Sequence, residues 1–358
     1  MISTVEATPN IAVVKYWGKR DEKLILPQEG SLSFTMDEQL KTRTSVMFSP
    51  KLKQDEFWLN GKKMDLTDKD TSERLGQIDI VRQKAGTKDR ALIVSLNCFP
   101  TAAGFASSAA GMAALACAAS KAAGLNLSTK ELSILARLGS GSACRSVLGG
   151  FVEWKKGAKS DGSDSYAEQI APHTHWPEIR NVIAVVDAGK KKVSSRAGMK
   201  QTVLTSPLFK ARLAYLPKLI DDMKKAVLAK DFAAFGEMTM RESSNMHAVM
   251  LDTWPPILYL NDWSKQIMYA VADYNSAAGE TAAAYTFDAG PNAHVYTTGK
   301  QVDSVKKMLG EIEGVKKIIV CKVGAGPKYL DAKESLVSDD GTVRKHFYDE
   351  EKNRIVVE

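Results

Sequence analysis

Pro100-Thr-Ala-Ala-Gly-Phe-Ala-Ser-Ser-Ala-Ala-Gly111 is the stretch of sequence on which the interpretation of the fold depends. It follows residues 90–97, an apolar and β-branched segment that predicts a buried strand ending near Asn97. It leads into the small residues 112–119, which predict a helix. The stretch is therefore predicted to be a loop that joins a strand to a helix.

Two interpretations of this loop are open from its own residues. Gly104 permits a left-handed backbone or the close approach of a ligand, and Ser107 and Ser108 are preferred capping residues at a helix start. The unpaired N–H groups of a helix start attract anions, so the loop predicts a phosphate site. The alternative is a helix whose small residues only allow it to pack closely against a sheet.

Composition indicates an ordinary globular protein with a preference for anionic ligands. The 358 residues are 44% hydrophobic and 25% charged, enough for one large or two medium cores. Lys and Arg number 49 against 42 Asp and Glu, a net charge of +7. This excess is too dispersed to predict a nucleic-acid surface, and a run such as 190–192 is more commonly a solvated face.

The spacing of the cysteines favours a reducing compartment, and the lack of a signal segment or a long apolar segment favours the cytoplasm. Cys98, Cys117, Cys144 and Cys321 lie far apart and predict free thiols. The first residues do not resemble a secretory signal, and no apolar run is long enough to cross a membrane. We therefore expect a cytoplasmic protein without a membrane partner.

Two further segments combine cations with residues suited to binding. In Lys15-Tyr-Trp-Gly-Lys-Arg20 the lysines can face an anion while the aromatic rings wall a pocket, or the rings can lie in the core with the lysines extended to water. In residues 139–146, glycines and serines surround Arg145, which can bind a carboxylate or phosphate through two parallel hydrogen bonds. A plain glycine–serine turn is the alternative.

The remaining pattern predicts an α+β fold. Alternating residues at 31–36 and 42–48 predict antiparallel strands, and Asn60-Gly61 predicts a hairpin. Helices are expected over 72–84, 130–138, 237–250, 263–277 and 301–314. Asp288 stands before a Gly-Pro-Asn turn, where a carboxylate is ordinarily a turn former. The charged segment after residue 328 is expected to be peripheral, and no set of metal ligands is expected at His173 and His175.

Together, these segments resemble the GHMP kinase superfamily and, within it, the diphosphomevalonate decarboxylases. Residues 100–111 resemble the phosphate loop of the superfamily. The combination of residues 16–20, 139–145 and 285–292 resembles the decarboxylases in particular, and the similarity runs from about residue 7 to 327. The resemblance implies a two-lobed α+β fold with mixed and antiparallel sheets. It also implies a nucleotide-binding lobe over 1–187, a second lobe over 188–358, and an active site in the cleft between them.

The resemblance further implies ATP-dependent conversion of (R)-5-diphosphomevalonate to isopentenyl diphosphate, with ADP, phosphate and CO2 as the other products. The cofactors would be ATP and Mg²⁺, the assembly a homodimer, and the pathway that of mevalonate, which leads to isoprenoids and sterols. Two alternatives are a kinase that stops at the phosphorylated product and a sensor that binds phosphate ligands without catalysis. Arg145 and Trp17 favour decarboxylation, and Asp288 argues against a sensor, because binding needs no such carboxylate.

The resemblance also implies roles for individual residues. Asp288 would act as the base or orienting carboxylate at the tertiary 3-hydroxyl, Arg145 would hold the substrate carboxylate, and Lys15 would support Asp288 electrostatically. The other residues expected at the substrate are Tyr16, Trp17, Gly18, Lys19, Arg74, Ser140, Gly141, Ser142, Ala143, Cys144, Ser194, Ser195 and Arg196. Those expected at ATP are Asn97, Gly104, Ala106, Ser107 and Ser108. No side chain is expected to be a metal ligand.

Overall fold

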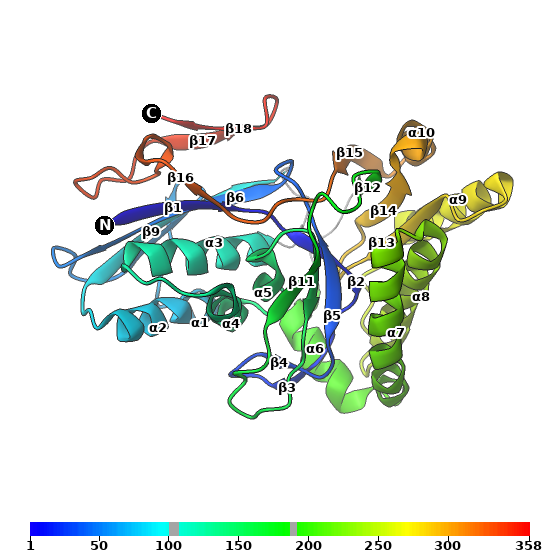
Figure 1. Cartoon of the computed structure of the whole chain (residues 1–358), viewed down its shortest axis with the longest axis horizontal. Helices are drawn as coiled ribbons and strands as arrows, with labels where there is room; N and C mark the ends of the chain where they lie inside the picture. Colours follow the sequence, from blue (N-terminus) through cyan, green and yellow to red (C-terminus); the bar gives the residue numbers. More distant parts are fainter. Residues whose placement is uncertain (100–106, 187–191) are drawn as a thin grey trace.

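The structure is a computed structural model that describes residues 1–99, 107–186 and 192–358. Its elements gather into two lobes, which lie side by side along the longest axis of the molecule (Figure 1). Helices and sheets occur in both lobes, and the sheets are antiparallel or mixed. The expected two-lobed α+β fold is therefore confirmed.

The N-terminal lobe is built on a mixed sheet. Its strand order is β16 (Lys328–Leu330), β1 (Ile2–Ala7), β6 (Lys41–Ser49), β9 (Arg90–Cys98), β7 (Glu56–Leu59) and β8 (Lys62–Lys63). Neighbouring strands are antiparallel except β7 and β9, which run parallel. The β7–β8 hairpin turns at Asn60 and Gly61, whose φ angles of 51° and 76° confirm the turn predicted from this pair.

Helices cover one face of this sheet (Figure 1). They are α1 (Lys69–Arg74), α2 (Gly76–Ala85), α3 (Ser107–Ala122), α4 (Thr129–Gly139) and α5 (Ala143–Ser146). The alanines of α3 are buried against β1 and β6, so the close packing that small residues permit is present. Ser128 and Glu131 form a capping box at the start of α4. The single helix expected over 72–84 is instead two helices, which meet at Leu75.

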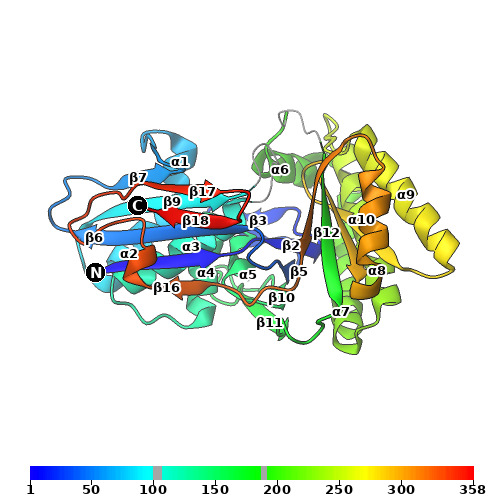
Figure 2. The same ribbon diagram turned by 90° about the horizontal axis from the view of Figure 1, so that it is seen from above.

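The C-terminal segment returns to the N-terminal lobe. Strand β16 pairs with β1, and the hairpin of β17 (His346–Asp349) and β18 (Arg354–Val357) lies on the sheet face opposite α3 (Figures 1 and 2). Leu336 and Val337 are buried with Leu92 and Val94 in one apolar cluster. The expectation that residues after 328 are peripheral is therefore wrong, because apolar side chains within this charged segment complete a core.

Two more sheets form the middle of the molecule and the C-terminal lobe. One has the order β11 (Ala167–Ala171), β10 (Phe151–Trp154), β5 (Ser31–Thr35) and β2 (Asn10–Val14). The other has the order β13 (Ala283–Phe287), β14 (Ala293–Thr298), β12 (Ile179–Val186) and β15 (Val315–Cys321). A core rich in aromatic side chains joins them, with Tyr296 of β14 against Phe34 of β5 and Phe235.

Helices cover the outer side of the C-terminal lobe (Figure 1). They are α7 (Phe209–Ala229), α8 (Phe232–Leu251), α9 (Asp262–Ala278) and α10 (Val302–Gly310), while α6 (Ser195–Thr205) lies between the lobes. The short elements are β3 (Lys19–Asp21), β4 (Leu26–Pro27), η1 (Gly299–Gln301) and η2 (Ala332–Glu334). Helix α8 packs on α7 and on β13 and also contacts β2. It therefore contacts strands of two different sheets, β13 and β2.

Strand pairing crosses the lobe boundary that was predicted at residue 187. Strand β12 precedes this residue but pairs with β14 and β15 of the C-terminal lobe. Strand β16 follows it but pairs with β1 of the N-terminal lobe. The boundary itself stays a prediction. Each lobe contains one strand from the other side of it, β12 in the C-terminal lobe and β16 in the N-terminal lobe.

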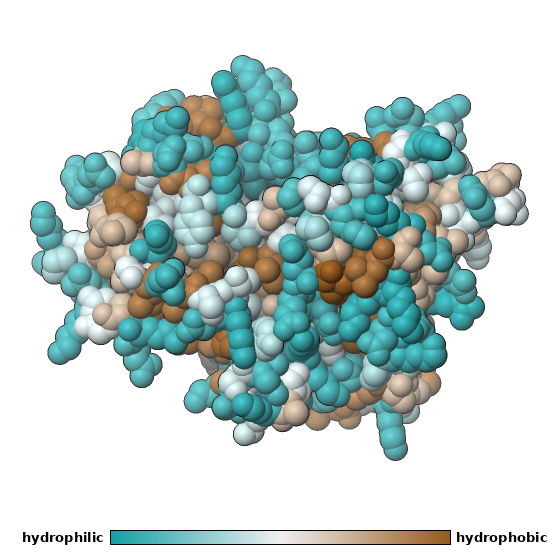
Figure 3. All heavy atoms as spheres, viewed as in Figure 1, coloured by the Kyte–Doolittle hydropathy of each residue, from teal (hydrophilic) through white to brown (hydrophobic). Residues whose placement is uncertain are grey.

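Hydrophilic side chains cover most of the face seen in Figure 3, and the hydrophobic ones form separate patches. Within the described residues, none of the helices combines the length and the apolar character that a membrane span requires. Cys98, Cys117, Cys144 and Cys321 are buried free thiols, as their spacing predicted.

Candidate active site

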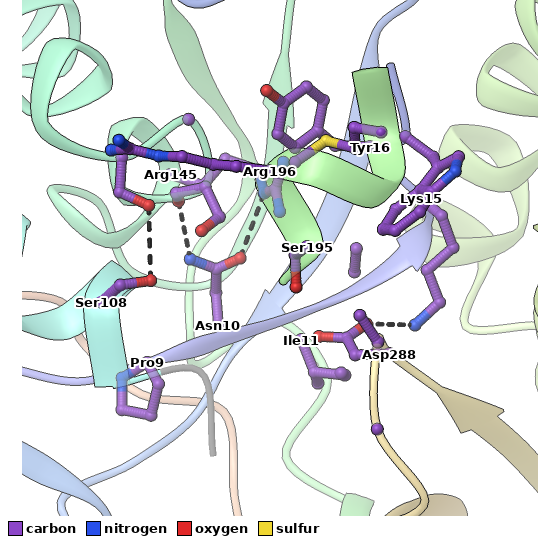
Figure 4. Close-up of a pocket in the computed structure, with 18 of the residues that line it drawn as sticks. Pro9, Asn10, Ile11, Lys15, Tyr16, Ser108, Arg145, Ser195, Arg196 and Asp288 are labelled. Atoms are coloured by element: carbon purple, nitrogen blue, oxygen red, sulfur yellow. Dashed lines mark hydrogen bonds and ion pairs between the residues drawn. The ribbon is translucent and has the colours of Figure 1, made fainter. Parts of the chain in front are cut away.

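A cavity of about 580 Å³ brings together most of the segments predicted to bind ligands. Its walls come from the end of β2, the start of α3, the residues around α5, the start of α6 and the turn after β13 (Figure 4). The predicted site residues that line it are Lys15, Tyr16, Trp17, Lys19, Ser108, Ser140, Gly141, Ser142, Arg145, Ser194, Ser195, Arg196 and Asp288. Segments more than 270 residues apart in the sequence thus share one cavity, since Lys15 and Asp288 both line it.

Lys15 and Asp288 form an ion pair in the wall of this cavity. Lys15 follows β2 and Asp288 follows β13, and Nζ of the lysine donates to Oδ1 of the aspartate at 2.7 Å (Figure 4). The side chain of Lys15 is 1% exposed and that of Asp288 is 42% exposed. The carboxylate therefore opens to the cavity, while the lysine supports it from behind.

Burial and charge act in opposite directions on this pair. Burial lowers the pKa of Lys15, although the nearby Asp288 carboxylate opposes that change. Burial also disfavours the charged form of Asp288, but the charge and hydrogen bond of Lys15 outweigh it and hold the pKa of Asp288 below its usual value. Asp288 is therefore a carboxylate at neutral pH and is available as a proton acceptor.

His294 of β14 also lines the cavity and was not among the predicted site residues. Its ring is buried, which lowers its pKa to about 4 against the opposing charge of Asp288. The side-chain amide of Asn181 donates to Nδ1 at 3.1 Å. His294 is therefore neutral at pH 7 and adds no charge beside the ion pair.

Arg145 lies on the opposite wall, where Asn10 fixes its orientation. Nε of Arg145 donates to Oδ1 of Asn10 at 3.1 Å, and Nη1 donates to Oγ of Ser31 at 2.5 Å. Figure 4 shows the contact between Asn10 and Arg145. Asn10 in turn donates to Oγ of Ser146 at 2.8 Å and to the carbonyl oxygen of Ser142 at 3.0 Å. Sequence reasoning missed Asn10, since a single amide at a strand start carries no recognisable signal.

The environment of Arg145 is suited to an anionic ligand. The residue is 2% exposed, and burial lowers the pKa of its guanidinium, which nevertheless stays charged. Among the described residues it forms no ion pair, and its hydrogen bonds go to neutral side chains. A buried charge without a counter-ion is costly. A ligand carboxylate or phosphate in the cavity would supply one.

The third wall holds serines and Arg196 around two helix starts. Ser108 lies in the first turn of α3, and Oγ of Ser140 donates to it at 3.4 Å. Ser194 caps α6 by accepting from the N–H of Ala197. Arg196 of α6 contacts Glu73 of α1 at 3.3 Å and the carbonyl oxygen of Gly139 at 3.4 Å. Helix starts, hydroxyls and a guanidinium make this wall a suitable site for phosphates.

The aromatic residues Tyr16 and Trp17 close one side of the cavity. The ring of Tyr16 packs against Trp154 with centroids 4.7 Å apart, and Nε1 of Trp17 donates to Thr202 at 3.0 Å. Gly141 lies flat against the Tyr16 ring, since an added Cβ would come within 2.8 Å of it. Burial raises the pKa of Tyr16 well above its usual value, so its hydroxyl remains a neutral donor in the cavity wall.

Four predicted site residues do not line this cavity. Gly18 forms the turn after Trp17 with a φ of 107°, and an added Cβ would come within 2.6 Å of Phe209. The side chains of Ala143 and Cys144 are fully buried in apolar clusters, and burial raises the pKa of the Cys144 thiol to about 12. Asn97 accepts a hydrogen bond from Thr42 within the sheet. The fold uses these side chains for packing and turns, and the ligand contacts expected of these four residues stay predictions.

The other four predicted site residues are Arg74, Gly104, Ala106 and Ser107. Ser107 is the first residue of α3 and Arg74 is the last residue of α1. Gly104 and Ala106 lie outside the described residues. The ligand contacts expected of these four positions stay predictions.

A two-lobed α+β fold whose cleft holds helix starts, buried cations and a lysine-backed carboxylate defines an enzyme that acts on phosphorylated small molecules. Residues 7–167 match the family model "Diphosphomevalonate decarboxylase-like N-terminal domain", and residues 181–313 match "Mevalonate 5-diphosphate decarboxylase C-terminal domain". The chain belongs to the diphosphomevalonate decarboxylase family.

Relatives at high coverage agree with this assignment. The diphosphomevalonate decarboxylase of Debaryomyces hansenii is 42% identical over 95% of this chain and 97% of its own length. That of Homo sapiens is 41% identical over 92% and 93%, respectively. The solved structure of mevalonate diphosphate decarboxylase from Trypanosoma brucei superimposes with a TM-score of 0.88 at 36% identity, covering 94% of this chain and all of that one.

A further solved structure carries ligands. It is described as MDDEF in complex with MVAPP, AMPPCP and magnesium, and it matches with a TM-score of 0.84 at 38% identity over 92% of this chain and 99% of its own.

Proposed function

We propose that this chain catalyses the ATP-dependent decarboxylation of (R)-5-diphosphomevalonate to isopentenyl diphosphate, with release of ADP, phosphate and CO2. The observation that carries the proposal is the pair of Lys15 and Asp288, whose carboxylate faces a cavity that also holds the guanidinium of Arg145, which has no ion-pair partner in the part of the chain that the structure describes. A reaction that first activates a hydroxyl and then expels a carboxyl group needs both features. Membership of the family supports the same chemistry.

The first step is transfer of a phosphoryl group to the 3-hydroxyl. A tertiary alcohol is a poor nucleophile, so it must be aligned with the γ-phosphoryl group and relieved of its proton. Asp288 orients the hydroxyl and accepts the proton, since its low pKa keeps it ionised. Lys15 stabilises the negative charge of Asp288 and that of the transferring group. Ser107 and Ser108 at the start of α3 hold the phosphates of ATP.

The donors of the cavity suit a Mg²⁺ ion that arrives with ATP. Among the described residues there is no cluster of three or more His, Cys, Asp or Glu side chains that could hold a metal by itself. Mg²⁺ is commonly bound largely through substrate phosphates and water, and the cavity would add the hydroxyl of Ser108 at the start of α3. When bound, Mg²⁺ offsets the negative charge of the transferring phosphoryl group.

The second step expels the new phosphate and the carboxyl group. Departure of phosphate leaves positive character on the tertiary carbon, and the electrons of the carboxylate collapse into the new double bond as CO2 leaves. Arg145 orients the carboxylate for this collapse, with its own orientation set by Asn10 and Ser31. Its contact must be weaker in the transition state than a full ion pair, since the carboxylate loses its charge as it reacts.

The remaining lining residues bind the diphosphate and exclude water. Lys19, Ser140, Ser142, Ser195 and Arg196 supply charge and hydrogen-bond donors in one region of the cavity. Tyr16 and Trp17 cover it and lower the effective dielectric constant around the reacting groups.

We further propose that the enzyme is a cytoplasmic homodimer of the mevalonate pathway, whose product serves isoprenoid and sterol synthesis. Its partners are the two small-molecule substrates, without nucleic acid or membrane. Four buried free thiols support a reducing compartment, and the family resemblance supports the dimer.

Diphosphomevalonate labelled in its carboxyl group tests the reaction directly. With ATP and Mg²⁺, we expect labelled CO2 and ADP in equal amounts. ADP without CO2 would instead identify a kinase that stops at the phosphorylated product, and binding without either product would identify a sensor.

A further inference from the structure

Helix α8 contacts the backbone beside both members of the Lys15–Asp288 pair. Glu242 and Ser243 are consecutive residues of this helix, and both are buried. Oε1 of Glu242 accepts from the backbone N–H of Lys15 at 2.9 Å. Oγ of Ser243 accepts from the backbone N–H of Phe287, the residue before Asp288, at 3.0 Å.

Arg212 of α7 completes the contact at Lys15. Its guanidinium binds both oxygens of Glu242, at 3.0 Å and 2.5 Å, and also donates to the carbonyl oxygen of Lys15 at 3.2 Å. The side chains of Arg212 and Glu242 are both 0% exposed. The N–H and the C=O of Lys15 are therefore both held by one buried ion pair.

Stability alone is a poor explanation for this ion pair. Removing two charges from water costs about as much as their attraction returns, so apolar side chains of similar size would serve a core equally well. The pair instead carries hydrogen bonds to the one residue whose Nζ must meet Asp288. A buried network of several hydrogen bonds also favours a single arrangement, which an apolar contact does not enforce.

We infer that Glu242, Ser243 and Arg212 are positioning residues that set the distance between Lys15 and Asp288. Lys15 follows a strand of the central sheet and Asp288 follows a strand of the C-terminal sheet. A single rigid helix that binds the backbone beside each of them fixes one strand end against the other. This inference rests on the proposed function, because it assigns the reaction to the Lys15–Asp288 pair.

Loss of a positioning contact should lengthen the separation between Nζ and Oδ1 and so alter the protonation of Asp288. Burial raises the pKa of this carboxyl and Lys15 lowers it, so a more distant Lys15 raises the pKa. The acid limb of the pH profile of kcat then moves to higher pH. The charged and titratable groups around the pair are Glu242 and His247 of α8, Arg212 of α7, Arg145 of α5, and His294 and Tyr296 of β14.

The test compares Ser243→Ala and Glu242→Gln with Phe235→Leu in the full-length enzyme. Phe235 is a buried residue of the same helix that packs in the aromatic core, so its variant loses packing but no contact with the pair. We expect the first two variants to lose between about 10-fold and 100-fold in kcat, with KM for both substrates unchanged. Their acid limbs move to higher pH, while Phe235→Leu keeps the wild-type kcat and acid limb even where its melting temperature falls.

Each outcome of this comparison is decisive. Ser243→Ala removes a single hydroxyl, so it carries the test if Glu242→Gln, which disturbs a buried charge, fails to fold. Wild-type kcat and acid limb in a folded Ser243→Ala variant would overturn the inference, as would equal losses in Phe235→Leu. If the wild-type enzyme releases no CO2, the proposed function fails; if it does and the variants match the control, only the positioning role fails.

Discussion

Two walls of the cavity differ in how firmly their polar groups are held. The first, which we call the catalytic wall, holds Lys15 and Asp288. Lys15 is 1% exposed and its Nζ lies 2.7 Å from Oδ1 of Asp288, and the ion pair of Arg212 and Glu242 that contacts the Lys15 backbone is completely buried. The second, which we call the phosphate wall, holds Ser108, Ser140 and Arg196. Arg196 contacts Glu73 at 3.3 Å, and their side chains are 37% and 50% exposed. Ser140 reaches Ser108 only at 3.4 Å.

The difference separates groups that react from groups that bind. Buried contacts fix geometry before substrate arrives, which is what proton and phosphoryl transfer require. Exposed ion pairs contribute between about 0 and 1 kcal/mol, so a phosphate can replace them at little cost. The catalytic wall is thus prearranged, and the phosphate wall can adjust to its ligands.

Replacement of Asp288 by Asn should break the catalytic wall most severely. The amide keeps the shape of the side chain but accepts no proton, so kcat should fall by about 100-fold to 10,000-fold. Steady-state kinetics with the labelled substrate measures this loss. Titration with a non-hydrolysable ATP analogue should show unchanged affinity, and an Asn variant that turns over normally would remove Asp288 from the mechanism.

Lys15→Met tests the electrostatic support of the same wall. We expect kcat to fall by about 100-fold and its acid limb to move to higher pH. The direction follows from the two effects on Asp288: burial raises its pKa and Lys15 lowers it, so without the lysine the carboxyl protonates at higher pH. A profile of kcat against pH for both proteins checks this, and an acid limb at unchanged pH would contradict it.

Arg145→Lys tests whether the fixed orientation of this side chain or only its positive charge is needed on the wall opposite Lys15 and Asp288. Lysine keeps the charge but cannot reproduce the fixed hydrogen bonds to Asn10 and Ser31. We expect kcat/KM for diphosphomevalonate to fall by about 10-fold to 100-fold, while KM for ATP stays close to the wild-type value. Equal losses for both substrates would show instead that the variant disturbs the whole cavity.

Glu73→Gln should have the smallest effect and so marks the adjustable wall. The contact with Arg196 is exposed, and we expect the free energy of unfolding to change by less than about 1 kcal/mol. Release of Arg196 should leave KM for diphosphomevalonate unchanged or slightly lowered. Denaturant unfolding and steady-state kinetics measure the two effects. A large loss of stability would show that the contact between Glu73 and Arg196 is held as firmly as those of the catalytic wall.

Sequence reasoning located the site by its local segments. Residues 15–20 and 139–146 were recognised because cations, serines and glycines crowd into short stretches, and most of them line the cavity. Ala143 and Cys144 belong to such a segment, but their side chains are buried in the core, since successive residues of a helix point in directions about 100° apart. The composition of a segment does not show which of its side chains point into the cavity and which point into the core.

The supporting residues were harder to predict, because their contacts connect distant parts of the chain. Glu242 lies 227 positions from Lys15. One signal was available: Phe235, Thr239, Glu242, Met246 and Val249 belong to the buried face of α8 and recur at helical spacing. A carboxylate within such a stripe requires a buried partner, but the helical pattern does not identify that partner.

The pairing of β1 with β16 has a consequence for how the protein is made. About 320 residues separate the two strands, which at ~5–20 residues per second corresponds to tens of seconds of translation. During that interval the sheet of the emerging N-terminal lobe has an open edge along β1, and open edges invite pairing with other chains. Strand β16 follows the helices and strands of the C-terminal lobe in the sequence, so the first strand of the chain gains this neighbour only after that lobe has been synthesised.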